Sequence, residues 1–291
     1  MRHPLVTGVD GSDGSLEAVD WAAAEAARSA LPLRLVYASA WQHYEQHLPT
    51  SGTERPEERV YADNLVATAA NRARKAEPGI DVSASTEPGD AVSVLLDQAH
   101  RASQLVLGTR GHGTVLGMLL GSVSLTVAAR AVCPVVVVRD GGRPVHGGRV
   151  VVGLGSGAQA VTALRYALEE ARVRQGELIA VRAWHAPAHE ALEDPLLTAS
   201  PHAALHRQAA ELTARALDAV ADRSEGVRVT TRLVEGPAHL ALVKESADAD
   251  LLVVGARRRH QWYGLQLGPT SHAALHHAHA PVAVVPDHPP G

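Results

Sequence analysis

Phenylalanine is absent from this 291-residue chain, and cysteine occurs only once. With aromatic residues at 3% and abundant alanine, the hydrophobic cores must be aliphatic. The single thiol, Cys133, cannot form an internal disulfide, which fits a reducing compartment. We therefore expect a cytoplasmic protein in which Cys133 is a small buried apolar residue rather than a reactive thiol.

The sequence also lacks an excess of positive charge and any long apolar run. Its formal net charge of −4 argues against a general nucleic-acid binder, since no surplus of cations is available to displace counterions. No uninterrupted apolar segment reaches membrane-spanning length, and residues 1–9 lack the apolar region of a signal peptide. We expect neither nucleic acid nor membrane among the partners.

Apolar strand patterns alternate with helical patterns through the first half of the chain. The predicted strands are 5–9, 33–38, 82–86, 104–107 and 134–138, and the predicted helices are 15–26, 57–75, 90–102 and 122–131. A polar excursion with Pro and Gly, residues 43–58, interrupts the series. Such alternation predicts an α/β fold with a parallel sheet and right-handed crossovers.

The pattern then restarts, so the chain contains an internal repeat. Gly108 and Gly121 recur as Gly255 and Gly268 with the same offset. Each half then ends with a valine-rich strand that follows a proline, Pro134 in the first half and Pro281 in the second. We predict two tandem domains, residues 1–140 and 149–291, joined by a glycine-rich linker over 141–148. The excursion 43–58 and its counterpart 187–201 are the segments where we expect partner specificity.

A glycine-rich loop follows the strand 104–107 and leads into the helix that begins near Ser122. Glycine lets backbone approach a ligand closely, and a helix start presents N–H groups to an anion. The hypothesis is a phosphate cradle, and the alternative is an ordinary strand-to-helix connection. If the first and fourth strands are neighbours, Asp10 lies across the crevice from this loop. Asp10 could bind ribose or the adenine edge, or could simply cap its own helix.

The motif Gly108-x2-Gly111-x9-Gly121-Ser122, together with Val9-Asp10-Gly11-Ser12, resembles the ATP-binding universal stress proteins. The resemblance covers both halves and implies two doubly wound domains, each a five-stranded parallel sheet of order 3-2-1-4-5 with helices on both faces. It also implies ATP, accompanied by Mg2+, as the ligand. By position, the resemblance assigns the nucleotide contacts to Gly8, Asp10, Ala38, Gly108, Thr109, Arg110, Gly111, Gly113, Gly121, Ser122 and Val123.

The second half departs from that motif at three positions. Gly155, Arg258 and Pro269 stand where the first half has Asp10, Gly111 and Ser122. A carboxylate, a glycine and an N–H donor are thereby lost. We predict that the second domain binds ATP weakly or not at all and serves as a pseudo-symmetric partner. The alternative is that the arginines 257–259 replace the backbone donors.

Two further patterns offer competing functions for the second half. Residues 153–158 match G-x-G-x-x-A, a weak dinucleotide fingerprint, and Arg182 could meet an NADP 2′-phosphate. His202/His206 and His272/His276 are i,i+4 pairs that could bind a metal or titrate together near neutral pH. Degeneracy of an ancestral loop and ordinary surface histidines are the simpler interpretations, and we predict no metal-ligating protein residues.

The resulting functional hypothesis is an ATP-binding regulatory protein of the stress response. The alternative is a slow ATPase or adenylate-forming enzyme using the same crevice, although no nucleophile, base and orienting group occur together. The resemblance further implies pairing through the fifth strands, 135–138 and 282–285, within the chain as a pseudo-dimer or between chains as a homodimer. The sequence does not identify protein partners.

Overall fold

The computed structural model describes residues 3–39, 56–109, 111, 120–139, 147–155, 157–185, 201–256 and 267–287. The chain divides into two compact units, residues 1–142 with 289–291 and residues 143–288. Each unit is an α/β domain built around a parallel sheet.

In the first unit, five parallel strands alternate with helices, and the strand order is β3-β2-β1-β4-β5. The elements are β1 (Leu5–Gly8), α1 (Asp13–Ser29), β2 (Leu33–Ser39), α3 (Pro56–Ala76), β3 (Val82–Pro88), α4 (Ala91–Ala99), β4 (Gln104–Gly108), α5 (Ser122–Arg130) and β5 (Val135–Val138). The predicted order 3-2-1-4-5 is confirmed.

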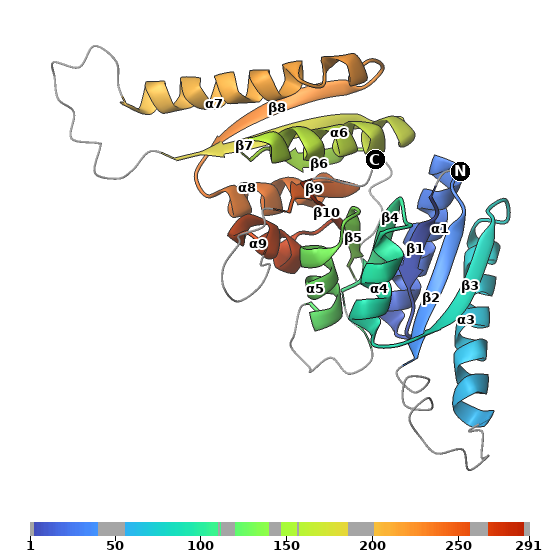
Figure 1. The fold of residues 1–291 in the computed structure, drawn as a ribbon. Coiled ribbons are helices and arrows are strands. Elements are labelled where there is room, and N and C mark those ends of the chain that lie inside the picture. The colour runs from blue at the N-terminus through green and yellow to red at the C-terminus, as the bar shows by residue number, and fades with distance from the viewer. Residues whose placement is uncertain are drawn as a thin grey trace. The chain divides into compact units, whose positions relative to one another are not determined.

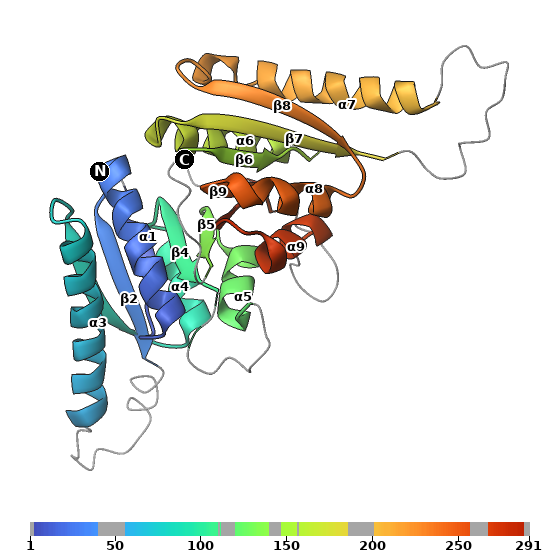
Figure 2. The ribbon, with the colours of Figure 1, turned by 180° about the vertical axis from the view of Figure 1, so that it is seen from behind.

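Helices cover both faces of this sheet. Helices α1 and α3 contact each other on one face, whereas α4 and α5 contact each other on the opposite face (Figures 1 and 2). The central strands are therefore enclosed on both sides, and every residue of β4 and β5 is buried. Continuous apolar runs such as Val135–Val138 are what a two-sided environment requires.

Helix α1 begins and ends where local chemistry dictates. The Ser12 side chain accepts a hydrogen bond from the Ser15 N–H at 3.2 Å and so caps the N-terminus. At the other end Ala30 has φ +50°, a left-handed conformation that ends the helix. Helix α4 is capped in the same way by Asp90, and it ends at Ala99 rather than at the predicted residue 102.

The second unit repeats this architecture with the strand order β8-β7-β6-β9-β10. Its elements are β6 (Val150–Gly153), α6 (Ala158–Val173), β7 (Glu177–Trp184), α7 (Pro201–Asp218), β8 (Arg228–Glu235), α8 (Ala238–Glu245), β9 (Leu251–Gly255), α9 (Pro269–His277) and β10 (Val282–Val285), with short 3-10 turns at Ala221–Arg223 and Ser246–Asp248. Helices α6 and α7 pack together, as do α8 and α9.

The predicted fold class, two doubly wound α/β domains, is confirmed. Within the described residues, no helix combines the length and apolar character that crossing a membrane would require.

Candidate functional site

The loop after β1 is organised by the Asp10 carboxylate. Asp10 Oδ1 accepts hydrogen bonds from the Ser12 N–H at 3.0 Å and from the Ser12 hydroxyl at 2.6 Å. Gly11, between them, has φ +84°, which glycine adopts without strain. Ser12 then caps α1, so Asp10 is fixed through the residue that starts the helix. The N-cap of α1 is therefore Ser12 and not Asp10, and one of the two Asp10 carboxylate oxygens positions Ser12.

The other carboxylate oxygen lies against the loop that follows β4. A Cβ atom added at Gly111 would be 2.2 Å from Asp10 Oδ2. The structure therefore brings Asp10 and Gly111 together, as expected if β1 and β4 are neighbours, and their register confirms that pairing. A side chain at position 111 would displace the carboxylate from the geometry that Ser12 holds.

Close backbone packing also explains Gly108, the last residue of β4. An added Cβ there would be 2.4 Å from the Gly14 carbonyl oxygen, so only glycine lets β4 approach the first turn of α1. The Gly108 carbonyl accepts a hydrogen bond from the Ser124 hydroxyl at 2.7 Å. Gly108 is thus required by the fold, whatever ligand the loop holds.

Thr109 lies deeper than a ligand-contacting residue would. It is 3% exposed; its N–H donates to the Val138 carbonyl at 3.0 Å, and its carbonyl accepts from the Gly121 N–H at 2.6 Å. The second of these bonds closes the loop by tying the end of β4 to the start of α5. Both main-chain groups of Thr109 therefore support the loop structurally.

Helix α5 begins immediately after this closure. Gly121 is its N-cap, without a side-chain hydrogen bond, and the first intrahelical bond runs from the Leu125 N–H to the Gly121 carbonyl at 3.1 Å. The N–H groups of Ser122 and Val123 precede that bond, and Ser122 is exposed. The start of α5 is thus suited to binding an anion.

Two of the remaining predicted residues lie on neighbouring strands. Gly8 ends β1, and a Cβ there would meet Leu107 at 3.0 Å and Leu95 at 3.1 Å, so it faces the α4 side of the sheet. Ala38 is half-buried near the end of β2. Arg110 and Gly113 lie outside the described residues, as does His112.

Sequence reasoning missed Tyr37 and Ser124. Partial burial raises the pKa of Tyr37, and the neighbouring negative groups Tyr61 and Asp10 add to that rise. Tyr37 is therefore a further polar group at this edge of the sheet. The repeat offered a signal for Ser124, because its counterpart Ser271 makes the same bond to the Gly255 carbonyl at 2.9 Å.

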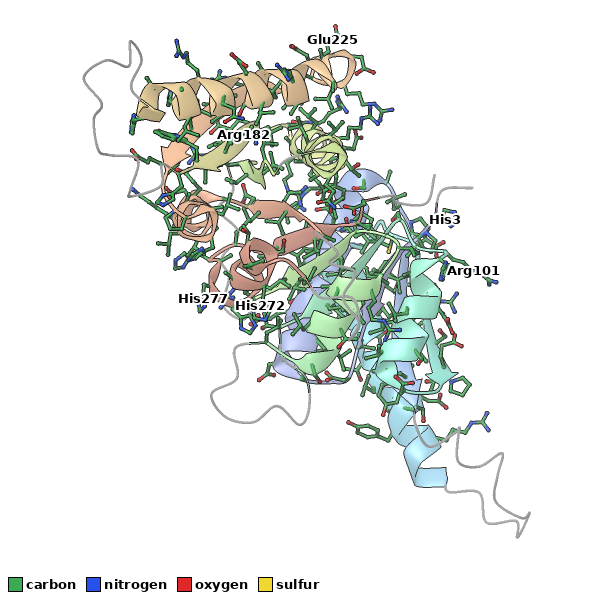
Figure 3. The ribbon with its side chains drawn as sticks, turned by 60° about the vertical axis from the view of Figure 1, so that its left-hand side comes forward. His3, Arg101, Arg182, Glu225, His272 and His277 are labelled. Atoms are coloured by element: carbon green, nitrogen blue, oxygen red, sulfur yellow. The ribbon has the colours of Figure 1, made fainter. Side chains whose placement is uncertain are left out.

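The equivalent region of the second unit is an open cavity of about 370 Å³. Gly155 and Pro269, two of the three departures seen in sequence, line it, whereas Arg258 lies outside the described residues. Arg182, on β7, also lines the cavity (Figure 3). Burial lowers the pKa of Arg182 below its ordinary value.

The histidine pairs do not assemble a metal centre within the described residues. There, no group of three or more His, Cys, Asp or Glu side chains is placed to hold a metal ion. His202 Nε2 lies 3.1 Å from Glu235 Oε2, and its ring packs edge-on against Trp184. The rings of His272 and His276 lie 4.5 Å apart on α9, which Figure 3 locates through the labels of His272 and His277.

Comparisons with known proteins agree with the architecture. The universal stress protein family model matches residues 1–139 and 148–286. The universal stress protein Rv2005c of Mycobacterium tuberculosis is 32% identical over 97% of both chains, and Rv1996 of the same organism is 29% identical over 96% of this chain and 94% of its own. A crystal structure of a universal stress protein from Archaeoglobus fulgidus shares the fold, with a TM-score of 0.70 and 20% identity over 98% of each chain.

These matches span both units, and the relatives have nearly the same length as this chain. The chain is therefore a tandem-domain member of the universal stress protein family.

Proposed function

We propose that the first unit binds an adenine nucleotide, ATP with Mg2+, and that the protein acts as a nucleotide-dependent regulator in the stress response. The observation that carries this proposal is the contact between the β1 and β4 loops. Asp10 Oδ2 occupies the space beside Gly111, so a carboxylate and a glycine-rich backbone lie together at the carboxyl ends of adjacent strands. Nucleotides bind open parallel α/β sheets at this edge.

The described groups divide into those that contact the nucleotide and those that hold the contacts in place. Asp10 accepts hydrogen bonds from ribose or the adenine edge, and the β2 end at Ala38 presents backbone to the base. The phosphates lie against the Gly111 backbone and the first N–H groups of α5, those of Ser122 and Val123. Ser12 positions Asp10, and Ser124 positions the Gly108 carbonyl.

Arg110 and Gly113 complete the phosphate loop in this proposal, with Arg110 adding a charge-assisted contact. Mg2+ enters with the nucleotide. It commonly keeps several waters and binds through substrate phosphates, so the triphosphate holds it in this proposal and Asp10 remains at the ribose or adenine edge. The described residues contain no all-protein metal cage that would compete with this arrangement.

The second unit has a supporting role in this proposal, as a pseudo-symmetric partner. The fifth strands, β5 and β10, each consist of four apolar residues. Pairing through these strands, within the chain or between two chains, remains a prediction. The mass of the protein in solution tests the pairing between two chains, because a homodimer has twice the mass of one chain.

Isothermal titration of the full chain with Mg-ATP tests the nucleotide site. The Asp10→Ala variant is expected to weaken ATP at least about tenfold, because charged groups form the stronger hydrogen bonds. Asp81→Ala removes an exposed carboxylate from the same unit and is the matched control. Equal affinity in the Asp10→Ala and Asp81→Ala variants would overturn the proposed role of Asp10. Steady release of ADP in the same samples would instead favour a slow ATPase.

A further inference from the structure

The cavity of the second unit has a different chemistry from the crevice of the first. Its walls come from the ends of β6, β7 and β9 and from α6, α8 and α9, all within residues 143–288. Leu154, Val181, Leu242 and Val254 contribute apolar surface to it. A molecule entering this space meets aliphatic walls on several sides.

Among the described residues that line this cavity, Arg182 is the one with a charged side chain. Arg182 is 7% exposed, so most of the side chain is buried. Its Nε–H donates to Thr213 Oγ1 at 3.0 Å, and its Nη2 donates to the Gly155 carbonyl at 2.9 Å. Both partners are uncharged acceptors.

No carboxylate neutralises this cation within the part of the chain that the structure describes: the ion pairs found there do not include Arg182. Burying an unpaired charge is unfavourable, so buried arginines are generally matched by an anion. Two of the five guanidinium N–H groups serve Thr213 and Gly155, which leaves three for an anion, including one on each terminal nitrogen. That pair suits bidentate recognition of an oxyanion.

The two units carry opposite charges at the corresponding edge of the sheet, a carboxylate in the first unit and a guanidinium in the second. Strand register pairs Gly8 with Val36 and Gly153 with Val181, so Arg182 stands where the first unit has Tyr37. Two residues after the end of each first strand, Asp10 is replaced by Gly155. The second unit has thus lost the carboxylate of the site and gained a buried cation.

The start of α9 adds to this preference for negative charge. Pro269, Thr270 and Ser271 line the same cavity, and α9 presents its N-terminal end there. The first intrahelical bond runs from the His272 N–H to the Gly268 carbonyl, so the N–H groups of Thr270 and Ser271 precede it. Pro269 removes one donor but leaves these two.

We propose that the second unit binds a small organic oxyanion, a phosphate monoester or a carboxylate, whose charged end pairs with Arg182 and whose carbon body lies against the aliphatic wall. This ligand class differs from the nucleotide proposed for the first unit, because the described lining of the cavity contains no carboxylate that could recognise ribose. The second unit is then a separate ligand site and not only a structural partner.

Gly155 offers a variant that separates ligand binding from folding. A Cβ at Gly155 meets nothing within 4 Å, and its backbone is not in the left-handed region. Gly155→Asp therefore folds, and it places a carboxylate beside the Arg182 guanidinium, which already contacts the Gly155 carbonyl. The new carboxylate neutralises the cation and occupies the ligand's position.

Gly147→Asp is the matched control. It introduces the same side chain in the same unit, at an exposed glycine whose added Cβ also meets nothing within 4 Å and which does not line the cavity. Arg182→Gln is a second variant, which removes the cation itself.

The experiment is isothermal titration of the full chain with phenyl phosphate, benzoate and phenol. We expect at least one of the two anions to bind, phenol to bind at least about tenfold more weakly, and Gly155→Asp to reduce anion affinity by a similar factor while Gly147→Asp leaves it unchanged. The stronger of the two anions identifies phosphate or carboxylate as the preferred group. Hydrogen exchange checks that each variant keeps its strands protected.

Three results would overturn the proposal. These are the absence of binding by both anions, equal binding of phenol, and anion binding that survives Gly155→Asp. If Arg182→Gln unfolds the unit, Gly155→Asp still decides the outcome because it keeps the bonds that Arg182 makes to Thr213 and to the Gly155 carbonyl.

Discussion

The two units place groups of opposite charge on one scaffold, Asp10 in the first and Arg182 in the second. Both have the same strand order, and both tie the start of a helix to the fourth strand through a serine hydroxyl, Ser124 in one and Ser271 in the other. At the edge of the sheet, however, the first unit has the Asp10 carboxylate where the second has Gly155. The two units thus share the scaffold but differ in the residues at the carboxyl edge of the sheet.

Two of the differences between the units are sterically compatible with each other. In the first unit, Asp10 Oδ2 fills the space that a side chain at position 111 would need. The second unit has Gly155 in place of Asp10, and at the position of Gly111 the sequence has Arg258. Loss of the carboxylate removes the steric reason for glycine at that position, so the two substitutions are compatible with each other.

The largest expected difference in stability is between alanine substitutions at Gly108 and at its counterpart Gly255. Gly108→Ala forces a Cβ to within 2.4 Å of the Gly14 carbonyl oxygen, whereas at Gly255 the nearest atoms are 3.8 Å away. We expect Gly108→Ala to lower the free energy of unfolding of the first unit by about 2 kcal/mol or more. Gly255→Ala should change that of the second unit by less than about 0.5 kcal/mol. Hydrogen exchange of β4 and β9 amides measures both, and equal effects would contradict the difference in packing.

A smaller effect should be shared by the two units. Ser124→Ala and Ser271→Ala each remove a hydroxyl that donates to a carbonyl at the end of the fourth strand. Each loss should cost its own unit about 1 kcal/mol, the usual net value of such a bond. Denaturant titration followed by hydrogen exchange measures the cost in each unit. A cost confined to one unit would show that the serine bond is not a common element of the scaffold.

The smallest expected effect is on the pH dependence of the stability of α4. Hydrogen bonds from Ser93 lower the pKa of the Asp90 carboxyl, which caps α4, whereas Pro237 precedes the equivalent helix α8 and offers no side-chain cap. A depressed folded-state pKa stabilises above the unfolded pKa, and that stability is lost as the pH falls through the folded value.

Protection of α4 amides should therefore decrease in the wild-type chain as the pH falls below the ordinary Asp pKa of about 3.9, and Asp90→Asn should remove this part of the pH dependence. Helix α8 serves as the internal control. Identical pH profiles for wild type and Asp90→Asn would exclude the cap as the cause.

Much of the fold could be predicted from sequence because both units rely on buried apolar strands with strong periodic signals. Strands such as Val135–Val138 differ from the prediction by a single residue, and the strand order followed from the resemblance. Helix ends were less certain: α4 stops at Ala99, where His100 provides the C-cap, although the apolar pattern continues to Ala102. Local hydrogen bonding, which periodicity does not encode, determines such ends.

The sequence predicts candidate site residues, but it does not predict how these residues contact one another. Asp10 and Gly111 were chosen for ligand chemistry, and their mutual contact could emerge only from the register of β1 and β4. Thr109 was assigned to the nucleotide because it lies within the motif, yet its main chain is engaged in closing the loop. The burial of Arg182 was likewise invisible in sequence, since it depends on α7 supplying Thr213.

The most direct test of the account is the number of ATP molecules bound per chain, measured by native mass spectrometry with Mg2+ present. We predict one bound nucleotide on the wild-type chain. Gly111→Arg, which places the second unit's residue in the first unit, should lose that nucleotide, and Gly155→Asp should retain it. Two nucleotides per wild-type chain would contradict the account. An ATP affinity of Gly111→Arg within about twofold of wild type, which is a difference below about 0.4 kcal/mol, would also contradict it.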